Sequence, residues 1–80
     1  MKYVIFSKSE CPFCQRAKAI LEDRDLPHHI IDFKEEQRGI LQEIKVAASW
    51  NTVPMIFQVA DDGVIKLIGG CSELESLLSV

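Results

Sequence analysis

The sequence lacks an apolar run long enough to cross a membrane, since a transmembrane helix needs roughly 20 such residues. Its N-terminus, MKYVIFSKSE, becomes polar after Phe6. It therefore also lacks the apolar stretch of about 7–15 residues that is typical of a secretory signal. From these two absences we expect a protein that works in the cytoplasm and has no membrane partner.

Basic residues are also few, with 9 Lys and Arg against 12 Asp and Glu and a net charge of −3. No stripe of Lys or Arg is present, so neither nucleic acid nor an anionic lipid surface is an expected partner. The 80 residues are 48% hydrophobic, which is sufficient for one small core. We expect a monomer with a single domain, residues 1–80, whose active site lies on the surface of that core.

Cysteine is scarce, and an odd count of three argues against a framework of structural disulfides. Cys11 and Cys14 form a Cys-x-x-Cys pair, which is typical of half a zinc site, a structural disulfide or a reversible redox pair. A structural zinc needs four ligands, and the other candidates are Cys71, His28 and His29. Adjacent histidines on a strand point to opposite faces, so at most one of them joins the pair. We therefore expect no metal site.

Hydrophobic periodicity predicts an α/β protein with the element order βαβαββα. The predicted strands are residues 3–6, 28–32, 55–59 and 64–68, and the first is expected to be buried on both faces. The first two strands flank a helix that follows the cysteines and ends near Asp25, and this βαβ unit makes them parallel. The last two flank Ala60-Asp61-Asp62-Gly63, a hairpin signal that makes them antiparallel. The result is a four-stranded mixed sheet with helices on its faces.

Two more helices complete the pattern. The second helix presents one apolar face, formed by Ile40, Leu41, Ile44, Ala47 and Ala48. Ser72-Glu73-Leu74-Glu75 reads as a capping box that opens the last helix, with Leu74, Leu77 and Leu78 directed inward.

Cys11 lies where the first strand gives way to the first helix, and Pro12 suits the first helical position. The helix N-terminus favours a thiolate there, so the pKa of Cys11 should fall from about 8.5 into the range of roughly 3.5–7.5. Lys8 favours this shift and Glu10 opposes it. Cys14 lies one turn further into the helix and should be more buried. We therefore expect an exposed Cys11 to attack and Cys14 to resolve.

Three segments resemble glutaredoxins of the dithiol class, and the likeness extends over nearly the whole chain. These segments are Lys8-Ser9-Glu10-Cys11-Pro12-Phe13-Cys14, Thr52-Val53-Pro54 and Gly69-Gly70-Cys71-Ser72. The resemblance implies a thioredoxin fold with the sheet order 2-1-3-4. It also implies glutathione-dependent reduction of protein disulfides and glutathione mixed disulfides by Cys11 and Cys14. Glutathione would be the electron donor, and a ribonucleotide reductase would be one protein substrate.

The resemblance further implies a glutathione site. A cis Val53–Pro54 bond would present the Val53 backbone to the cysteinyl part, and Gly69-Gly70 would let the backbone approach closely. The N–H groups of Cys71 and Ser72 would meet the γ-glutamyl carboxylate, and Lys8 would meet the glycyl carboxylate. The implied glutathione-binding residues are Lys8, Phe13, Thr52, Val53, Pro54, Gly70, Cys71, Ser72 and Arg38.

The sequence departs from the family pattern at three positions of this site. Phe13 replaces a usual Tyr, Ser72 replaces a frequent Asp, and Leu41 occupies a position that often carries Gln or Arg. Glu73 would partly replace the charge missing at Ser72, and Arg38 would act in place of Leu41. Cys71 is most simply a small residue that fits its position.

Two alternatives remain open at this point. The missing Asp at Ser72 leaves room for a glutaredoxin-like redoxin that is reduced by thioredoxin reductase. An iron–sulfur carrier with Cys11 and glutathione as cluster ligands belongs to a different class. Pro12 argues against that class, because it crowds and stiffens the turn that a cluster would approach.

Overall fold

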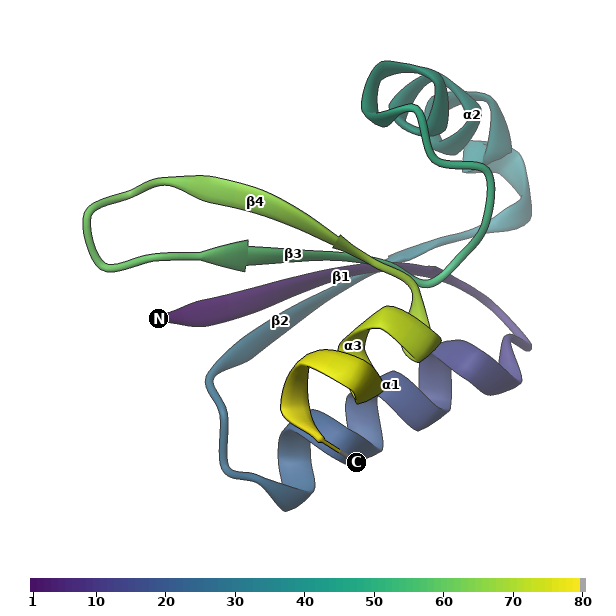
Figure 1. The fold of residues 1–80 in the computed structure, drawn as a ribbon. Helices are drawn as coiled ribbons and strands as arrows, with labels where there is room; N and C mark the ends of the chain where they lie inside the picture. The colour runs from purple at the N-terminus through teal and green to yellow at the C-terminus, as the bar shows by residue number, and fades with distance from the viewer. Residues whose placement is uncertain (80) are drawn as a thin grey trace.

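A four-stranded mixed sheet with the order β2-β1-β3-β4 organises the chain in the computed structural model, which describes residues 1–79 (Figure 1). The elements are β1 (Lys2–Lys8), α1 (Pro12–Asp23), β2 (His28–Phe33), the 3-10 turn η1 (Glu35–Gln37), α2 (Arg38–Ala48), β3 (Met55–Val59), β4 (Ile65–Gly69) and α3 (Cys71–Leu78). This confirms the predicted order and the thioredoxin-like topology. No helix within these residues is long and apolar enough to cross a bilayer.

The strand pairings also agree with the prediction. β1 runs parallel to β2 and antiparallel to β3, and β3 runs antiparallel to β4. Gly63 has a φ of 90° in the turn between β3 and β4, a conformation that glycine adopts at little cost. The parallel pair brings Ser7 of β1 opposite Asp32 of β2.

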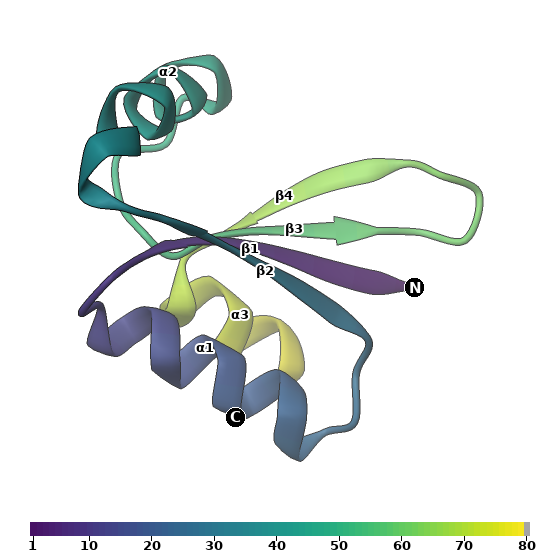
Figure 2. The same cartoon turned by 180° about the vertical axis from the view of Figure 1, so that it is seen from behind.

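The main core lies between the sheet and the pair α1 and α3, which cover the same face (Figures 1 and 2). Its buried residues are Tyr3, Ile5, Ala17, Ile20, Leu21, Ile56, Cys71 and Leu74. Burying one large aliphatic side chain contributes about 1.5–3 kcal/mol, so this layer supplies much of the stability of so small a domain. It also holds α1 and α3, whose N-terminal ends carry the cysteines, against the sheet.

The opposite face of the sheet is covered less completely, so the expectation that β1 is buried on both faces was wrong. Tyr3, Ile5 and Ser7 are buried, whereas Val4 and Phe6 are only partly so. Both views place α2 at the end of the sheet where β1 ends, away from α1 and α3 (Figures 1 and 2). Since α2 covers only that end, it buries few of its own apolar residues.

The helical regions of α2 and α3 are confirmed, but their predicted inward faces are only partly buried. In α2, Leu41 is buried and Ile40 is 55% exposed. In α3, Leu74 is buried and Leu78 packs against the same core, whereas Leu77 is 48% exposed. Leu74 and Leu78 are four residues apart and share one side of the helix, and Leu77 lies beside that side.

The start of α3 also differs from the predicted one. Gly70, not Ser72, is its N-cap, and the helix begins at Cys71. The Glu73 carboxylate folds back, and its Oε1 accepts the N–H of Gly70 at 2.9 Å. This earlier start leaves the backbone N–H groups of Cys71 and Ser72 in the first turn, without partners inside the helix.

Candidate active site

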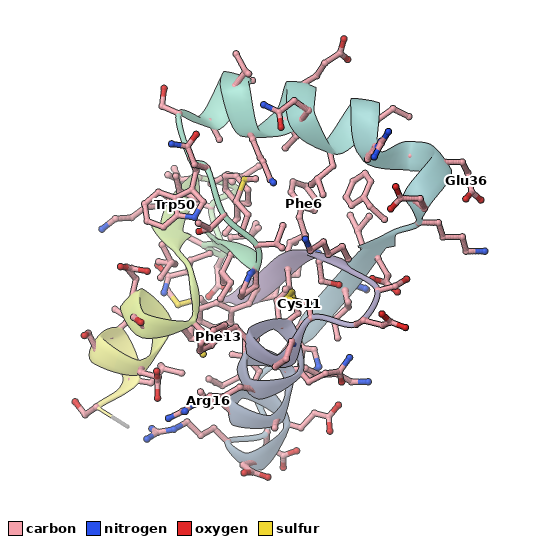
Figure 3. The ribbon with its side chains drawn as sticks, turned by 90° about the vertical axis from the view of Figure 1, so that its right-hand side faces the viewer. Phe6, Cys11, Phe13, Arg16, Glu36 and Trp50 are labelled. Atoms are coloured by element: carbon pink, nitrogen blue, oxygen red, sulfur yellow. A yellow bond between two sulfur atoms is a disulfide. The ribbon has the colours of Figure 1, made fainter. Side chains whose placement is uncertain are left out.

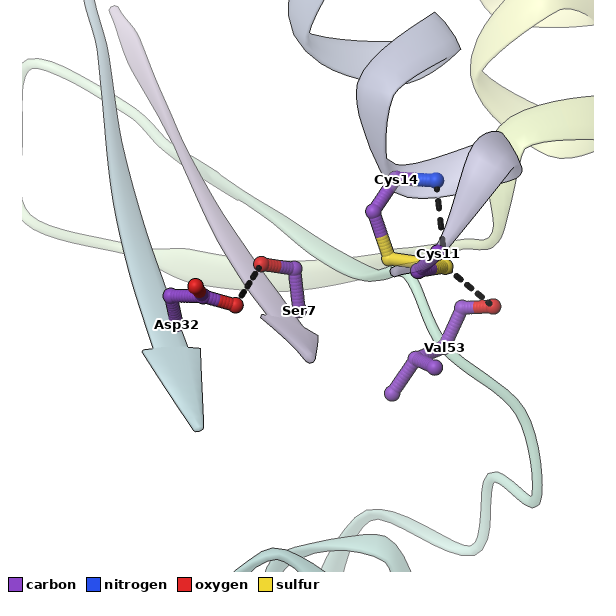
Figure 4. Close-up of a disulfide and its surroundings, with 5 residues drawn as sticks. All are labelled: Ser7, Cys11, Cys14, Asp32 and Val53. Carbon is purple, nitrogen blue, oxygen red and sulfur yellow. Dashed lines mark hydrogen bonds between the residues drawn. A yellow bond between two sulfur atoms is a disulfide. The ribbon is translucent and has the colours of Figure 1, made fainter. Parts of the chain in front are cut away.

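Cys11 and Cys14 form a disulfide at the start of α1, with their Cα atoms 5.2 Å apart (Figure 4). Cys11 is the N-cap in an extended conformation, and Pro12 follows at the first helical position. The backbone N–H of Cys14 donates to Cys11 Sγ at 3.2 Å. This confirms that the Cys11 sulfur faces the N-terminus of the helix.

The expectation that Cys11 is exposed was wrong for this oxidised form. Its exposed fraction is 6%, close to the 4% of Cys14. The loop before β3 covers the sulfur, because the carbonyl oxygen of Val53 lies 4.0 Å from Cys11 Sγ. A cysteine in a disulfide carries no thiol proton, so this approach is a contact and not a hydrogen bond.

A pocket of about 250 Å³ lies beside this contact and brings together most of the residues implied to bind glutathione. Its lining residues are Phe13, Thr52, Val53, Pro54, Gly70, Cys71, Ser72 and Glu73. The Val53–Pro54 bond is cis, as expected. Among the lining residues within the described part of the chain, only Glu73 carries a charge.

Gly69 is packed closely against Glu73. A Cβ there would lie 2.7 Å from Cγ of Glu73, and its φ of 127° also disfavours other residues. A Cβ on Gly70 would lie 3.5 Å from the Pro54 carbonyl oxygen and 3.9 Å from the ring of Trp50. Trp50 therefore lies beside the pocket (Figure 3), and its buried Nε1 has no hydrogen-bond partner among residues 1–79.

Lys8 and Arg38 lie together in a second pocket, of about 280 Å³. The other lining residues are Ser9, Glu10, Phe33, Lys34, Glu35 and Leu41. Arg38 Nη1 donates to Glu35 Oε1 at 3.0 Å, and both side chains are largely exposed. The predicted site residues thus form two groups, one beside Phe13 and one beside Glu10 in the active-site loop.

Residues 3–64 match the family model for glutaredoxin. The chain belongs to the glutaredoxin family. It is 37% identical over 73 residues to glutaredoxin-1 of Rhizophagus irregularis, which covers 89% of this chain and 67% of that protein. It is 36% identical to the glutaredoxin of Haemophilus influenzae, with 98% of this chain and 91% of that one covered.

A solved structure supports the same assignment. The crystal structure of a buckwheat glutaredoxin–glutathione complex matches with a TM-score of 0.79 at 25% identity, over 96% of this chain and 67% of that one. Glutaredoxins are thiol–disulfide oxidoreductases, and the Cys11–Cys14 disulfide is the redox pair for that chemistry in this family member.

The histidines that were considered as zinc ligands lie on opposite faces of the sheet. His28 pairs with buried Tyr3, and His29 pairs with Val4 on the other face. The ring Nδ1 of His28 lies 2.8 Å from the carbonyl oxygen of Leu26. Within residues 1–79 no three His, Cys, Asp or Glu side chains are grouped as metal ligands would be.

Cys71 is a free thiol at the first position of α3 and is 5% exposed. Burial raises its pKa above the ordinary value, and the Glu75 carboxylate, 3.8 Å from Cys71 Sγ, adds to the rise. Arg16 of α1 (Figure 3) pairs with Glu75 at 2.5 Å and opposes the shift only in part. Cys71 therefore stays a thiol at neutral pH, which fits the expectation of a packing role.

Sequence reasoning missed two polar residues near the disulfide. Ser7 is 5% exposed, and its Oγ donates to Asp32 Oδ1 at 3.1 Å (Figure 4). One signal was present in the sequence, because Ser7 continues the alternation of Tyr3 and Ile5 along the inner face of β1. A hydroxyl at such a position needs a partner, and the parallel register supplies Asp32.

Proposed function

We propose that this glutaredoxin-family protein uses glutathione to reduce protein disulfides and glutathione mixed disulfides. The observation that carries the proposal is the pocket beside Phe13, Val53 and Gly70, whose Val53 carbonyl reaches the Cys11 sulfur. The match to a glutaredoxin in complex with glutathione supports it. A cytoplasmic location stays a prediction from the sequence, and a ribonucleotide reductase as protein substrate stays an implication of the family resemblance.

The chemistry begins with the reduced pair. The Cys11 thiolate attacks one sulfur of the substrate disulfide, and the other sulfur leaves as a thiolate. Because the Cys14 N–H points at Cys11 Sγ, it stabilises the negative charge of this nucleophile. Cys14 then displaces the substrate from Cys11 and closes the disulfide, which two glutathione molecules reduce.

The pocket beside Phe13 has groups suited to one end of glutathione. Val53 offers a backbone N–H and C=O, with which the cysteinyl part pairs like a short added strand. The first-turn N–H groups of Cys71 and Ser72 suit the γ-glutamyl carboxylate. Glu73 lines the same pocket and supplies the negative charge that Ser72 lacks, so it suits the γ-glutamyl ammonium.

The second pocket suits the glycyl end of glutathione. Lys8 and Arg38 line it together, and their positive charges favour the glycyl carboxylate. Glu35 already pairs with Arg38, and this competition weakens the contribution of Arg38. Lys8 is therefore the main proposed partner of the glycyl carboxylate.

The test measures reduction of the mixed disulfide between glutathione and 2-mercaptoethanol. Wild type, Cys11→Ser and Cys14→Ser are compared with glutathione, glutathione reductase and NADPH as the electron source. We expect wild type and Cys14→Ser to be active and Cys11→Ser to be inactive. Activity that persists in Cys11→Ser would contradict the assignment of the nucleophile.

A second candidate is a redoxin of this family that is reduced by thioredoxin reductase. The observation in its favour is that position 72 carries a serine, which leaves Glu73 as the single acidic residue lining the pocket. Replacing glutathione and its reductase by thioredoxin reductase in the same assay separates the two. Activity with thioredoxin reductase alone would favour this second candidate. For the iron–sulfur alternative, the visible absorption of anaerobically purified protein is the corresponding measurement.

A further inference from the structure

β2 forms one edge of the sheet, because within residues 1–79 it pairs with β1 alone (Figures 1 and 2). The carbonyl oxygen of Pro27 accepts the N–H of Tyr3 at 2.9 Å, so the Pro27 carbonyl points toward β1. Successive residues of a strand alternate in direction, so His28, Ile30 and Asp32 direct their N–H and C=O groups away from β1. Each of these residues therefore offers a backbone donor and a backbone acceptor to a further strand.

The two edges of the sheet differ in how well they are protected against pairing. β4, the other edge, carries the exposed Lys66 and the left-handed Gly69, and its register with β3 shifts between Ile56 and Phe57. Lysines and bulges are features by which proteins discourage the addition of a strand. β2 follows β1 in unbroken register, and its sequence HHIIDF contains no Lys, Pro or Gly. We therefore expect strand addition at β2 and not at β4.

A second copy of the same strand fits this edge. In a two-fold pair of antiparallel β2 strands, the outward-directed groups face each other when Ile30 lies opposite Ile30 of the other copy. His28 then lies opposite Asp32 of the other copy, once on each side of the two-fold axis. The pairing also covers apolar surface, because Ile30 is 36% exposed and Ile31, on the other face of the strand, is 44% exposed.

This register is complementary in charge as well. Asp32 Oδ1 accepts the Ser7 hydroxyl at 3.1 Å, which leaves Asp32 Oδ2 free. His28 Nδ1 lies 2.8 Å from the carbonyl oxygen of Leu26, which can only accept, so Nδ1 carries a proton and Nε2 is free. A histidine ring gains a positive charge between about pH 8 and pH 5. In that form His28 Nε2 can donate to the Asp32 carboxylate of the other copy.

We propose that this protein forms a weak two-fold homodimer through antiparallel pairing of its β2 strands, centred on Ile30. The two four-stranded sheets then become one continuous sheet. An interface of one strand from each copy is small, so the association depends on protein concentration. The pocket beside Phe13 contains no residue of β2, so the pairing uses none of its lining. The dimer therefore does not depend on the proposed use of glutathione, and it departs from the monomer expected from the sequence.

The experiment measures sedimentation velocity of the protein at pH 6, at concentrations from about 10 µM to about 1 mM, where weak dimers form. An excess of a phosphine reductant excludes disulfides between copies. Wild type should shift from monomer toward dimer over this range. No glutathione is present, so failure of the dimer and failure of the proposed glutathione dependence are distinguishable.

Ile30→Lys tests the centre of the interface, because it places two like charges opposite each other at the two-fold axis. It should raise the Kd of the dimer about ten-fold or more. Ile65→Lys is the matched control, the same change at a 65% exposed position of the other edge, and it should associate as wild type does. Circular dichroism checks that both variants are folded.

The charged pair is tested by His28→Gln, which also serves if Ile30→Lys fails to fold. It should raise the Kd about two- to ten-fold at pH 6, since two exposed ion pairs are lost. The Kd of wild type should rise between pH 6 and pH 8, and His28→Gln should lose this rise. His29→Gln should keep it, because His29 lies opposite Ile31 of the other copy.

The other titratable groups around His28 are Glu22 and Asp25, which line a pocket of about 430 Å³ with it, and Tyr3, its partner in β1. Carboxylates and tyrosine hydroxyls do not ordinarily titrate between pH 6 and pH 8. Equal Kd values at these two pH values would therefore overturn the register that pairs His28 with Asp32. A wild type that stays monomeric, or an equal effect of Ile30→Lys and Ile65→Lys, would overturn the dimer. A monomer would leave the edge to an extended segment of a different protein.

Discussion

The two sulfurs of the disulfide are almost equally buried, yet their surroundings differ in kind. On the Cys11 side, backbone groups approach the sulfur: the Cys14 N–H at 3.2 Å and the Val53 carbonyl oxygen at 4.0 Å. In the view of Figure 4 the hydrogen-bonded side-chain pair Ser7 and Asp32 lies on the side of Cys14, without a bond to its sulfur. Backbone N–H groups stabilise an anion on the Cys11 sulfur. Neighbouring groups, rather than exposure, therefore distinguish the two cysteines.

The largest expected effect comes from removing the sulfur on the Cys11 side. Cys11→Ser should lower activity by roughly 10³-fold or more with either a protein disulfide or a glutathione mixed disulfide, as loss of a nucleophile does in other enzymes. Cys14→Ser should lose only the reduction of protein disulfides. Steady-state rates with both substrates measure the contrast. If Cys11→Ser and Cys14→Ser lost the same activity toward the mixed disulfide, the proposed difference between Cys11 and Cys14 would be contradicted.

The next largest expected effect is a difference between the alkylation rates of Cys11 and Cys71. In the reduced protein at pH 7, iodoacetamide should modify Cys71 about 100-fold more slowly than Cys11, because the thiolate is the reactive form. Burial and Glu75 raise the pKa of Cys71, so its labelling should keep climbing as the pH rises above neutrality. Mass spectrometry of peptides follows each site, and comparable rates at pH 7 would contradict this prediction.

A change of stability should follow from crowding Glu73, which lines the pocket beside Phe13 and Val53. Gly69→Ala should lower the free energy of unfolding by about 1–3 kcal/mol, because the left-handed conformation strains a non-glycine residue and its Cβ would approach Glu73 Cγ to 2.7 Å. Gly39→Ala is the matched control, since nothing lies within 4 Å of its Cβ inside α2. It should be stabilising by about 0.5–1 kcal/mol. Urea denaturation measures both, and a neutral Gly69→Ala would show that Glu73 moves aside freely.

The smallest expected effect concerns the charge in the glutathione pocket. Glu73→Gln should raise the KM for glutathione about two- to five-fold, and Ser72→Asp should lower it similarly, because an exposed ion pair contributes about 0.2–1 kcal/mol. Steady-state kinetics at fixed low ionic strength measures both variants. Glu36→Gln is the control, since Glu36 lies in the middle of η1 (Figure 3), outside both pockets. A KM unaffected by either pocket variant would mean that this charge has no part in binding.

Much of the fold was predictable because its signals are local. The apolar run of β1, the helix start at Pro12 and the hairpin ending at Gly63 depend on neighbours in sequence. The degree of burial was less predictable. Val4 and Leu77 are apolar and were expected inside, but their burial depends on how α2 and the short α3 lie on the sheet.

The candidate site, like the fold, was predictable from the sequence only in part. Cys11 as the N-cap of α1 and the cis Val53–Pro54 bond were expected. The N-cap of α3 was predicted at Ser72 but is Gly70, two residues earlier. The sequence pattern from Ser72 to Glu75 is typical of a cap, but it is the Glu73 carboxylate that accepts the N–H of Gly70. The covering of Cys11 by Val53 joins residues 42 positions apart, which no local pattern reports.

By itself, the sequence determined the element order, the family and the positions of the redox cysteines, because these follow from residue type and short-range spacing. The tertiary structure alone decided what surrounds each sulfur. The register of β1 against β2 placed Asp32 beside Ser7, and the loop before β3 placed Val53 over Cys11. Such contacts depend on the packing of distant segments, and it is this packing that gives two similar thiols different neighbours.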